Sequence, residues 1–356
     1  ATRAPDFSSG AISLVDAESP FAAQNNLPPS DTSDILVRSG GDHYYVIQRF
    51  GADRILRFAA DDPTTPVYSY STQDPDDTES SNPADLLILS PTKAYLLRYG
   101  SDALWIVNPS AASEAEFKIG EIDLSAYDPD GIPEMTAGVI KQGILYVLMQ
   151  RLENFFPTRN GYVAIIDTAT DQQIDTGVAN PDDLPGIELP LRNPGQVLSN
   201  PGNDDLVILS GGGVDPVTFD PLFNGGILRF HTVSYDTDLL VDDGEADSPP
   251  FGQFTDLAIT ATDRAYFVGS QGFFGNQNLF RFDPTGDAAP VPVAVAQDIG
   301  IGTLAADGQN RLWLGRTETA SPGLTVLDVA GATESVIEDL IDTVLTPINI
   351  DFLSSP

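Results

Sequence analysis

The sequence contains no cysteine, two histidines and few basic residues. The absence of cysteine excludes disulfides, thiolate metal sites and a cysteine nucleophile. Lys and Arg total 17 against 52 Asp and Glu, which gives a formal net charge of −35. Nucleic acid is not expected as a partner, because phosphate binding requires a basic face. A surface this acidic is more typical of solubility in salty surroundings than of one specific partner.

Long apolar runs and catalytic motifs are also missing. No apolar run is long enough to cross a bilayer, so no transmembrane segment is expected. The patterns G-x-S-x-G, the P-loop and H-E-x-x-H do not occur. His43 and His231 lie near no nucleophile pattern, and we interpret both as structural. The stretch DPDG at 128–131 is only a fragment of a calcium loop, which favours a solvated turn. We predict no catalytic residue, no metal site and no cofactor.

What the sequence does contain is a repeat. One type of stretch has a turn-forming start, four or five mostly apolar residues and a small or polar stop, which is typical of a short buried strand. Glycine and proline recur between such runs, as in all-β folds with many turns. Seven copies fill the chain: GAISLVDAES (10–19), DRILRFAADD (53–62), DALWIVNPSA (102–111), GYVAIIDTAT (161–170), GGILRFHTVS (225–234), QNLFRFDPTG (277–286) and PGLTVLDVAG (322–331).

Each copy belongs to a unit of four strand-like runs with short connections. We name the four strands A to D, and the repeated stretch is strand C. Four antiparallel strands per unit predict a propeller blade. The spacing of the copies leaves room for seven blades, so we predict an all-β, seven-bladed β-propeller with a single domain over residues 1–356. The closing blade is shared by residues 1–27 and 346–356, and 346–353 supply its inner strand. Residues 334–345 fit either a strand with a loop or a short helix.

Two units resemble a known family. The stretches SPTKAYLLRYGSDALWIVNPSA (90–111) and ILYVLMQ…GYVAIIDTATDQQI (144–174) resemble the YVTN-type repeat of seven-bladed propellers. That repeat reads roughly Tyr-Val-Thr-Asn, a short turn, then Val-x-Val-Ile-Asp-Thr-Ala-Thr. The resemblance implies the same fold, in a family whose members are mostly exported or surface binding proteins with diverse ligands.

The connections between strands B and C are uneven in length. They are tight in the first two full blades, at 50–53 and 99–102, and long in the next three, at 151–161, 211–226 and 270–278. Long loops on a rigid scaffold are where binding usually occurs. An alternative is that the aromatic residues of these loops form small local cores. The candidate ligand-binding aromatics are Phe155, Phe156, Phe219, Phe223, Phe273 and Phe274.

Arginine recurs at the end of strand B. An anionic group of a ligand or partner could bind there through charge-assisted hydrogen bonds. The alternative is that each arginine pairs with a nearby aspartate of the acidic loops between strands D and A. The four candidates are Arg49, Arg98, Arg151 and Arg316.

We therefore predict an exported, non-catalytic propeller that binds another protein, or a small molecule with an apolar body, at its loop face. Two alternatives stay open: a lactonase-like hydrolase with a metal at the channel, and a structural protein that self-assembles at a surface or into filaments. The start at Ala1, without an initiator methionine or signal segment, fits a mature terminus after export or an artificially trimmed chain, and we favour export. An extracellular, cell-surface or periplasmic location is expected.

Overall fold

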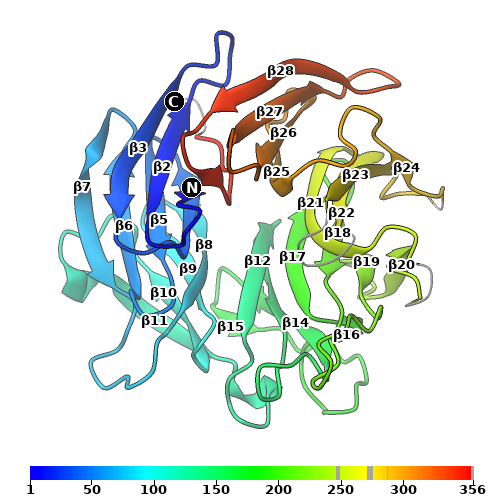
Figure 1. Cartoon of the computed structure of the whole chain (residues 1–356). Helices are drawn as coiled ribbons and strands as arrows, with labels where there is room; N and C mark the ends of the chain where they lie inside the picture. Colours follow the sequence, from blue (N-terminus) through cyan, green and yellow to red (C-terminus); the bar gives the residue numbers. More distant parts are fainter. Residues whose placement is uncertain (246–248, 271–275, 287, 354–356) are drawn as a thin grey trace. The chain divides into compact units, whose positions relative to one another are not determined.

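A computed structural model of the chain describes residues 1–245, 249–270, 276–286 and 288–353. These residues form seven antiparallel sheets, which are the blades of a seven-bladed β-propeller, as the sequence predicts (Figure 1). The chain comprises two compact units, of residues 1–72, 255–282 and 290–356 in the first and 73–254 and 283–289 in the second. The single domain expected from the sequence stays a prediction.

The first unit contains four sheets of four strands each. Strand C of each sheet coincides with one of the repeated stretches, so these four copies are confirmed. In order across each sheet, the strands are β29 (Thr346–Pro347), β1 (Thr2–Arg3), β2 (Gly10–Val15) and β3 (Ala23–Ser30); β4 (Ile35–Gly40), β5 (His43–Gln48), β6 (Arg54–Ala59) and β7 (Asp62–Ser71); β21 (Gln253–Ala261), β22 (Arg264–Ser270), β23 (Gln277–Phe282) and β24 (Val291–Pro292); β25 (Ile301–Ala306), β26 (Arg311–Arg316), β27 (Gly323–Asp328) and β28 (Ser335–Asp342).

The two ends of the chain share one of these sheets. Strand β29 pairs with β1, with Thr2 opposite Pro347 and Arg3 opposite Thr346. The Ile348 N–H then donates to the Ala1 carbonyl at 3.0 Å. Beyond this point the segment contacts β4 through its side chains, because Asn349 Oδ1 accepts a hydrogen bond from the Val37 N–H at 2.8 Å. The predicted inner strand at 346–353 is thus confirmed in position, although its regular pairing is short.

The second unit contains three sheets, and the repeated stretches at 102–111, 161–170 and 225–234 again supply strand C. Two short 3-10 helices, η1 (Glu114–Glu116) and η2 (Ser125–Tyr127), lie in its connections. The strands are β8 (Pro83–Ser90), β9 (Lys93–Arg98), β10 (Ala103–Val107) and β11 (Lys118–Asp123); β12 (Met135–Lys141), β13 (Ile144–Met149), β14 (Asn160–Asp167), β15 (Gln172–Gln173) and β16 (Ile187–Arg192); β17 (Pro194–Ser199), β18 (Asp205–Ser210), β19 (Gly226–His231) and β20 (Thr237–Asp242).

The middle sheet of the second unit has a divided outer position. The two-residue strand β15 pairs with the end of β14, whereas β16 pairs with its beginning, placing Arg192 opposite Asn160. The sequence predicts four strands per unit, with a single outer strand D, and does not predict β16. The helix alternative for residues 334–345 is wrong, because β28 covers Ser335–Asp342.

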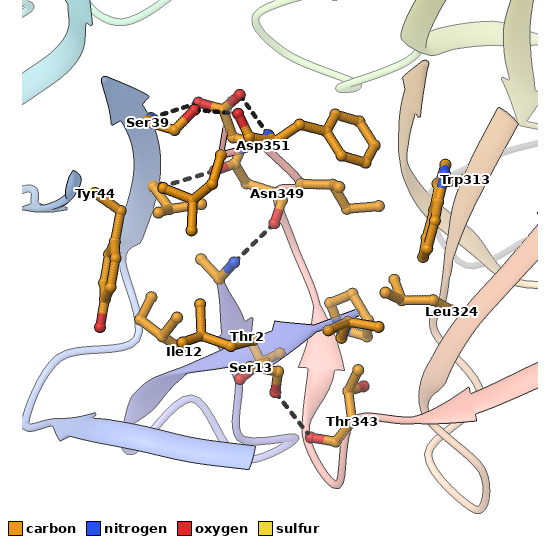
Figure 2. A pocket seen from close by; sticks show the side chains of 18 of the residues that line it. Thr2, Ile12, Ser13, Ser39, Tyr44, Trp313, Leu324, Thr343, Asn349 and Asp351 are labelled. Atoms are coloured by element: carbon orange, nitrogen blue, oxygen red, sulfur yellow. Dashed lines mark hydrogen bonds between the residues drawn. The ribbon is translucent and has the colours of Figure 1, made fainter. Parts of the chain in front are cut away.

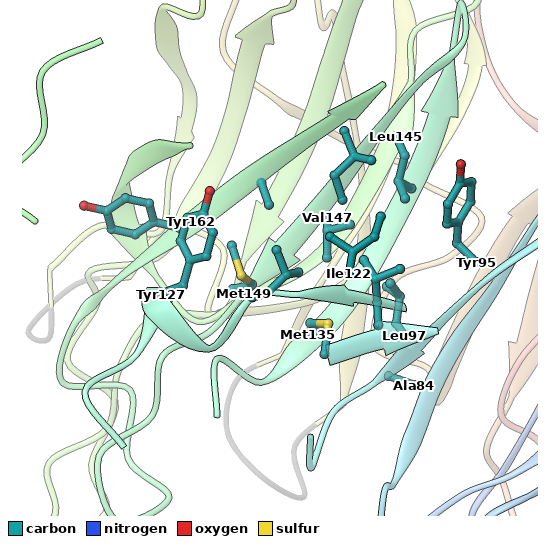
Figure 3. Close-up of a cluster of buried hydrophobic side chains, with 14 of the residues drawn as sticks. Ala84, Tyr95, Leu97, Ile122, Tyr127, Met135, Leu145, Val147, Met149 and Tyr162 are labelled. Carbon is teal, nitrogen blue, oxygen red and sulfur yellow. The ribbon is translucent and has the colours of Figure 1, made fainter. Parts of the chain in front are cut away.

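The central strands form the core because both of their faces are covered. In β13 every residue from Leu145 to Met149 is buried, and such a strand reads as a continuous apolar run. Met135 and Met149 pack with Leu97, Val147 and Tyr162 in one cluster of the second unit (Figure 3). This packed frame fixes the strand ends from which the loops emerge. Within the described ranges, no helix is long and apolar enough to span a membrane.

Candidate functional site

The two long B–C loops of the second unit lie between β13 and β14 and between β18 and β19. Each begins and ends on strands of the buried core, so its ends are held while its middle projects from the sheets. Rigid ends with a variable middle are the usual arrangement of a binding loop.

The loop after β13 contains a tight turn that directs the Phe155 side chain into solvent. Glu153 and Phe156 exchange backbone hydrogen bonds of 2.9 and 3.0 Å around Asn154 and Phe155. Asn154 and Phe155 have φ values of 51° and 70°, in the left-handed region. Asparagine tolerates that region, but a bulky residue seldom adopts it. Phe155 is 93% exposed, so burial does not explain why phenylalanine occupies this position.

The loop after β18 is ordered by its own hydrogen bonds. The Asp215 carboxylate accepts from the N–H groups of Val217 and Thr218, both at 2.8 Å. These hydrogen bonds hold the pKa of Asp215 below its usual value, so the group is ionised at neutral pH. Phe219 follows with φ 62° and Phe223 with φ 47°. Val217 is 83% exposed and Phe219 is 59% exposed.

An aromatic contact joins these two loops. The ring centroids of Phe156 and Phe219 lie 5.9 Å apart, with the ring planes tilted by 43°. Phe156 is half-buried, as is Phe223. The contact places the exposed residues of both loops on one surface. We call this surface the loop patch and define it by Phe155, Phe156, Val217, Phe219 and Leu222.

Buried and half-buried polar groups brace the base of the first loop. Glu134 Oε2 accepts the Leu152 N–H at 2.8 Å. Burial raises the pKa of Glu134 to about 7. Asp128 Oδ2 lies 3.1 Å from Arg159 Nη1, and burial also raises the pKa of Asp128. The stretch 128–131 forms a turn in which Pro129 and Asp130 are exposed, as expected, whereas Asp128 itself is a buried partner of Arg159. Among the described residues, no group of three or more His, Asp or Glu is placed to hold a metal ion.

All four candidate arginines contact a carboxylate. Arg98 and Arg151 are buried in the second unit, whereas Arg49 and Arg316 of the first unit are part-buried. The Arg151 guanidinium lies 4.5 Å from the ring centre of Tyr162, and its Nε donates to the Tyr127 carbonyl. Anion binding by these arginines stays a prediction. The pairs are Arg49 with Asp34 at 3.4 Å, Arg98 with Asp77 at 2.5 Å, Arg151 with Asp182 at 2.8 Å and Arg316 with Glu318 at 2.7 Å.

The third long loop, at 270–278, belongs to the first unit. Phe273 and Phe274 lie outside the described residues, so the patch is built without them. The two histidines contact carboxylates. His43 Nδ1 lies 2.5 Å from Asp42, and His231 lies 2.9 Å from both Asp205 and Asp238. The hydrogen bond to Asp238 raises the pKa of His231.

Comparison with known proteins shows the fold and no more. No family model matches the chain, and no curated protein is significantly similar to it. Hydrazine synthase of Kuenenia stuttgartiensis aligns over 92% of this chain and 94% of its own, with TM-score 0.62 and 12% identity. Virginiamycin B lyase of Staphylococcus aureus aligns over 87% and 85%, with TM-score 0.57 and 13% identity. The resemblance to the YVTN-type family is thus confirmed only at the level of a seven-bladed propeller.

A third structure aligns with a part of a longer chain. The extracellular domain of a one-component system from B. thetaiotaomicron matches 88% of this chain and 35% of its own, with TM-score 0.53 and 12% identity. Identities this low transfer no activity, ligand or location.

Sequence reasoning missed three residues of the site. Val217 and Leu222 flank phenylalanines within a loop that the sequence singles out, but aliphatic residues in a loop usually fold inward. Glu134 precedes β12, and nothing in its neighbourhood marks it as the acceptor for the next loop. Only the folded chain brings Glu134 to Leu152.

Proposed function

We propose that the chain is a non-catalytic, partner-binding β-propeller and that the loop patch binds another protein. The observation that supports this most strongly is the exposure of Phe155 and Val217 at the tips of two loops that meet through Phe156 and Phe219. Clusters of exposed apolar residues on a folded surface commonly mark interaction sites.

The backbone conformation supports the same proposal. A left-handed conformation costs a bulky L-residue about 1–2 kcal/mol relative to the usual helical one. Phe155 and Phe219 both adopt it, and both rings are largely solvent-exposed. Strained, exposed residues cluster at binding sites, because the partner supplies the contacts that the free protein lacks. Burying one phenylalanine contributes roughly 1.5–3 kcal/mol.

Charge indicates the kind of partner. Asp215 and Asp220 lie on either side of the Phe219 segment, and the chain as a whole carries −35. A second copy of the chain would therefore be repelled at low ionic strength. A surface with an apolar centre and a basic rim complements both features, and we assign that chemistry to the partner. Export to the cell surface, periplasm or exterior is part of this proposal and rests on the resemblance to YVTN-type repeats.

Site-directed photo-crosslinking tests the proposal. The photoreactive residue p-benzoylphenylalanine is placed at Phe155 in the full chain, and crosslinked products from the producing cells are identified by mass spectrometry. Val233 is the matched control position, because it is 82% exposed in the turn between β19 and β20, at the other end of the same sheet from the second loop.

The proposal expects one protein with a basic surface to crosslink from position 155 and not from 233. That protein must then bind the purified chain. If position 155 crosslinks only to other copies of this chain, the proposal of a different partner protein is wrong and the loop patch mediates self-assembly. Equal products from both positions would overturn the site.

A further inference from the structure

The first unit contains a pocket of about 280 Å³ beside the closing sheet. Its walls come from β2, the β4–β5 hairpin, β26 and β27, and the segment 347–353 crosses it. Figure 2 shows Tyr44 and Trp313 on opposite sides, with Asn349 and Asp351 on the crossing segment. This pocket shares no residue with the loop patch, which belongs to the second unit.

The interior of the pocket is mainly apolar. Ile12, Leu14, Val37, Leu324, Ile350 and Phe352 contribute to its walls. Two hydroxyl groups at the wall are occupied within the protein. Ser39 Oγ donates to the Phe352 carbonyl at 2.6 Å, and Thr343 Oγ1 donates to the Leu345 carbonyl at 2.8 Å. Water needs two to four polar partners to be held in a cavity, so this pocket suits an apolar body better than ordered water.

The size and aromatic walls indicate the shape of that body. Apolar cavities of roughly 150 Å³ bind benzene. This pocket is nearly twice as large, which fits a two-ring molecule. The Trp313 ring meets the Phe352 ring edge to face at 5.8 Å, so the two form a corner. Trp313 itself is buried, so a flat aromatic ligand would meet this corner at the half-buried Phe352 ring, since aromatic pairs favour edge-to-face or offset geometry.

Charge at the pocket favours one kind of substituent. Asp16 and Asp351 are the charged side chains among the described residues that line it. Asp351 accepts from the Ser39 and Phe352 N–H groups and interacts with the Arg38 charge, so Asp16 is the carboxylate that attracts a cationic substituent and repels an anionic one.

We propose that this pocket is a binding site for a flat, two-ring aromatic molecule that carries an amine. The ring body occupies the space between the Tyr44 and Trp313 walls, against Phe352, and the amine faces the carboxylate of Asp16. The site is independent of the proposed protein partner, so either can fail without the other.

Three probes with one ring system test the proposal on the full chain. Indole is neutral, tryptamine is cationic and indole-3-acetate is anionic at pH 7. Calorimetric titration should give a Kd at or below about 1 mM for indole. Tryptamine should bind more tightly than indole-3-acetate by about fivefold or more, the order expected for an exposed ion pair. Asp16→Asn should remove that preference and leave indole binding intact.

Variants that fill the pocket with a larger side chain provide a second test. Leu14→Trp should abolish binding of all three probes, and the smaller change Leu14→Phe should weaken it. Val336→Trp adds the same ring on the exposed outer strand β28 of the same unit and should bind like the parent chain. Circular dichroism melting checks that each variant is folded. Absence of indole binding in the parent chain, or equal binding by folded Leu14→Trp or Leu14→Phe, overturns the site. Equal affinity for the three probes would refute the proposal that the ligand carries an amine.

Discussion

The rings of Phe156 and Phe219 lie 5.9 Å apart and join two loops that come from different sheets of the second unit. Neither ring is fully buried, so the contact is not part of the core. Its consequence is that Phe155 and Val217, which are both exposed, belong to one surface instead of two separate loop tips.

The conformation of Phe155 predicts a gain in stability on substitution. Glycine adopts the left-handed region without the Cβ clash that Phe155 has at φ 70°. We expect Phe155→Gly to raise the free energy of unfolding by about 0.5–1 kcal/mol, because little burial is lost. Urea unfolding measures the difference. Phe155→Ala keeps the Cβ clash and is the control. An equal gain in stability with alanine would refute the proposed backbone strain at Phe155.

Substitution of Arg151 is expected to lower the stability of the protein. Arg151 donates to the Tyr127 carbonyl, pairs with Asp182 and lies over Tyr162, all within the second unit. Lysine cannot reproduce the planar, multiple contacts, so we expect Arg151→Lys to cost about 1–3 kcal/mol. Arg49→Lys, at a more exposed pair, should cost less than about 1 kcal/mol. Similar costs for the two variants in urea unfolding would contradict this assignment.

The raised pKa of Glu134 predicts that the stability of the protein depends on pH in a specific way. The pKa of Glu134 in the folded protein is about 7 because the carboxyl is buried, above the usual value of 4.5. The folded state therefore binds more protons between these values, and this group's contribution to stability falls as the pH rises from about 4.5 to about 7. Glu134→Gln stays neutral and keeps an oxygen for the Leu152 N–H.

The melting temperature of Glu134→Gln should match that of the parent near pH 4.5 and exceed it above pH 7. Thermal melts at several pH values between 4.5 and 8.5 measure the difference. A difference that does not change with pH would show that Glu134 is not buried as described.

The closing sheet predicts the effect of truncation. Removing residues from Thr346 onward deletes β29 and the hydrogen bonds that Asn349 and Asp351 accept from Val37 and Ser39. We expect one cooperative loss of structure and a melting temperature lower by at least about 10 °C, which corresponds to several kcal/mol. Asn349→Ala with Asp351→Ala removes only the side-chain bonds and should have a smaller effect. An unchanged melting temperature in the truncated chain would contradict the shared sheet.

The repeated third strand made the fold predictable from sequence. Residues 161–166 of one such stretch are buried on both faces, so the apolar run is visible in local composition. The outer strands were harder, because two-residue β15 and the added β16 depend on pairing with β14 and have little pattern of their own. The loops could be located by length alone.

The geometry of the candidate site could not be predicted in the same way. The outward position of Phe155 depends on two left-handed residues in a turn, and the contact of Phe156 with Phe219 depends on tertiary structure. The carboxylates that contact the four arginines come from other loops in three cases, so sequence could only offer pairing as an alternative. The pocket beside β29 has walls from both ends of the chain and no local signature.

The most direct test of the account is the affinity of the protein crosslinked from position 155 for two matched double variants. Phe155→Ser with Phe219→Ser removes the exposed rings of the loop patch, and Val233→Ser with Val291→Ser removes exposed apolar residues elsewhere. Calorimetric titration gives the Kd, and thermal melts establish that both variants are folded. The account predicts at least a hundredfold weaker binding for the phenylalanine variant and parent-like binding for the valine variant. Parent-like affinity in a folded phenylalanine variant would contradict it.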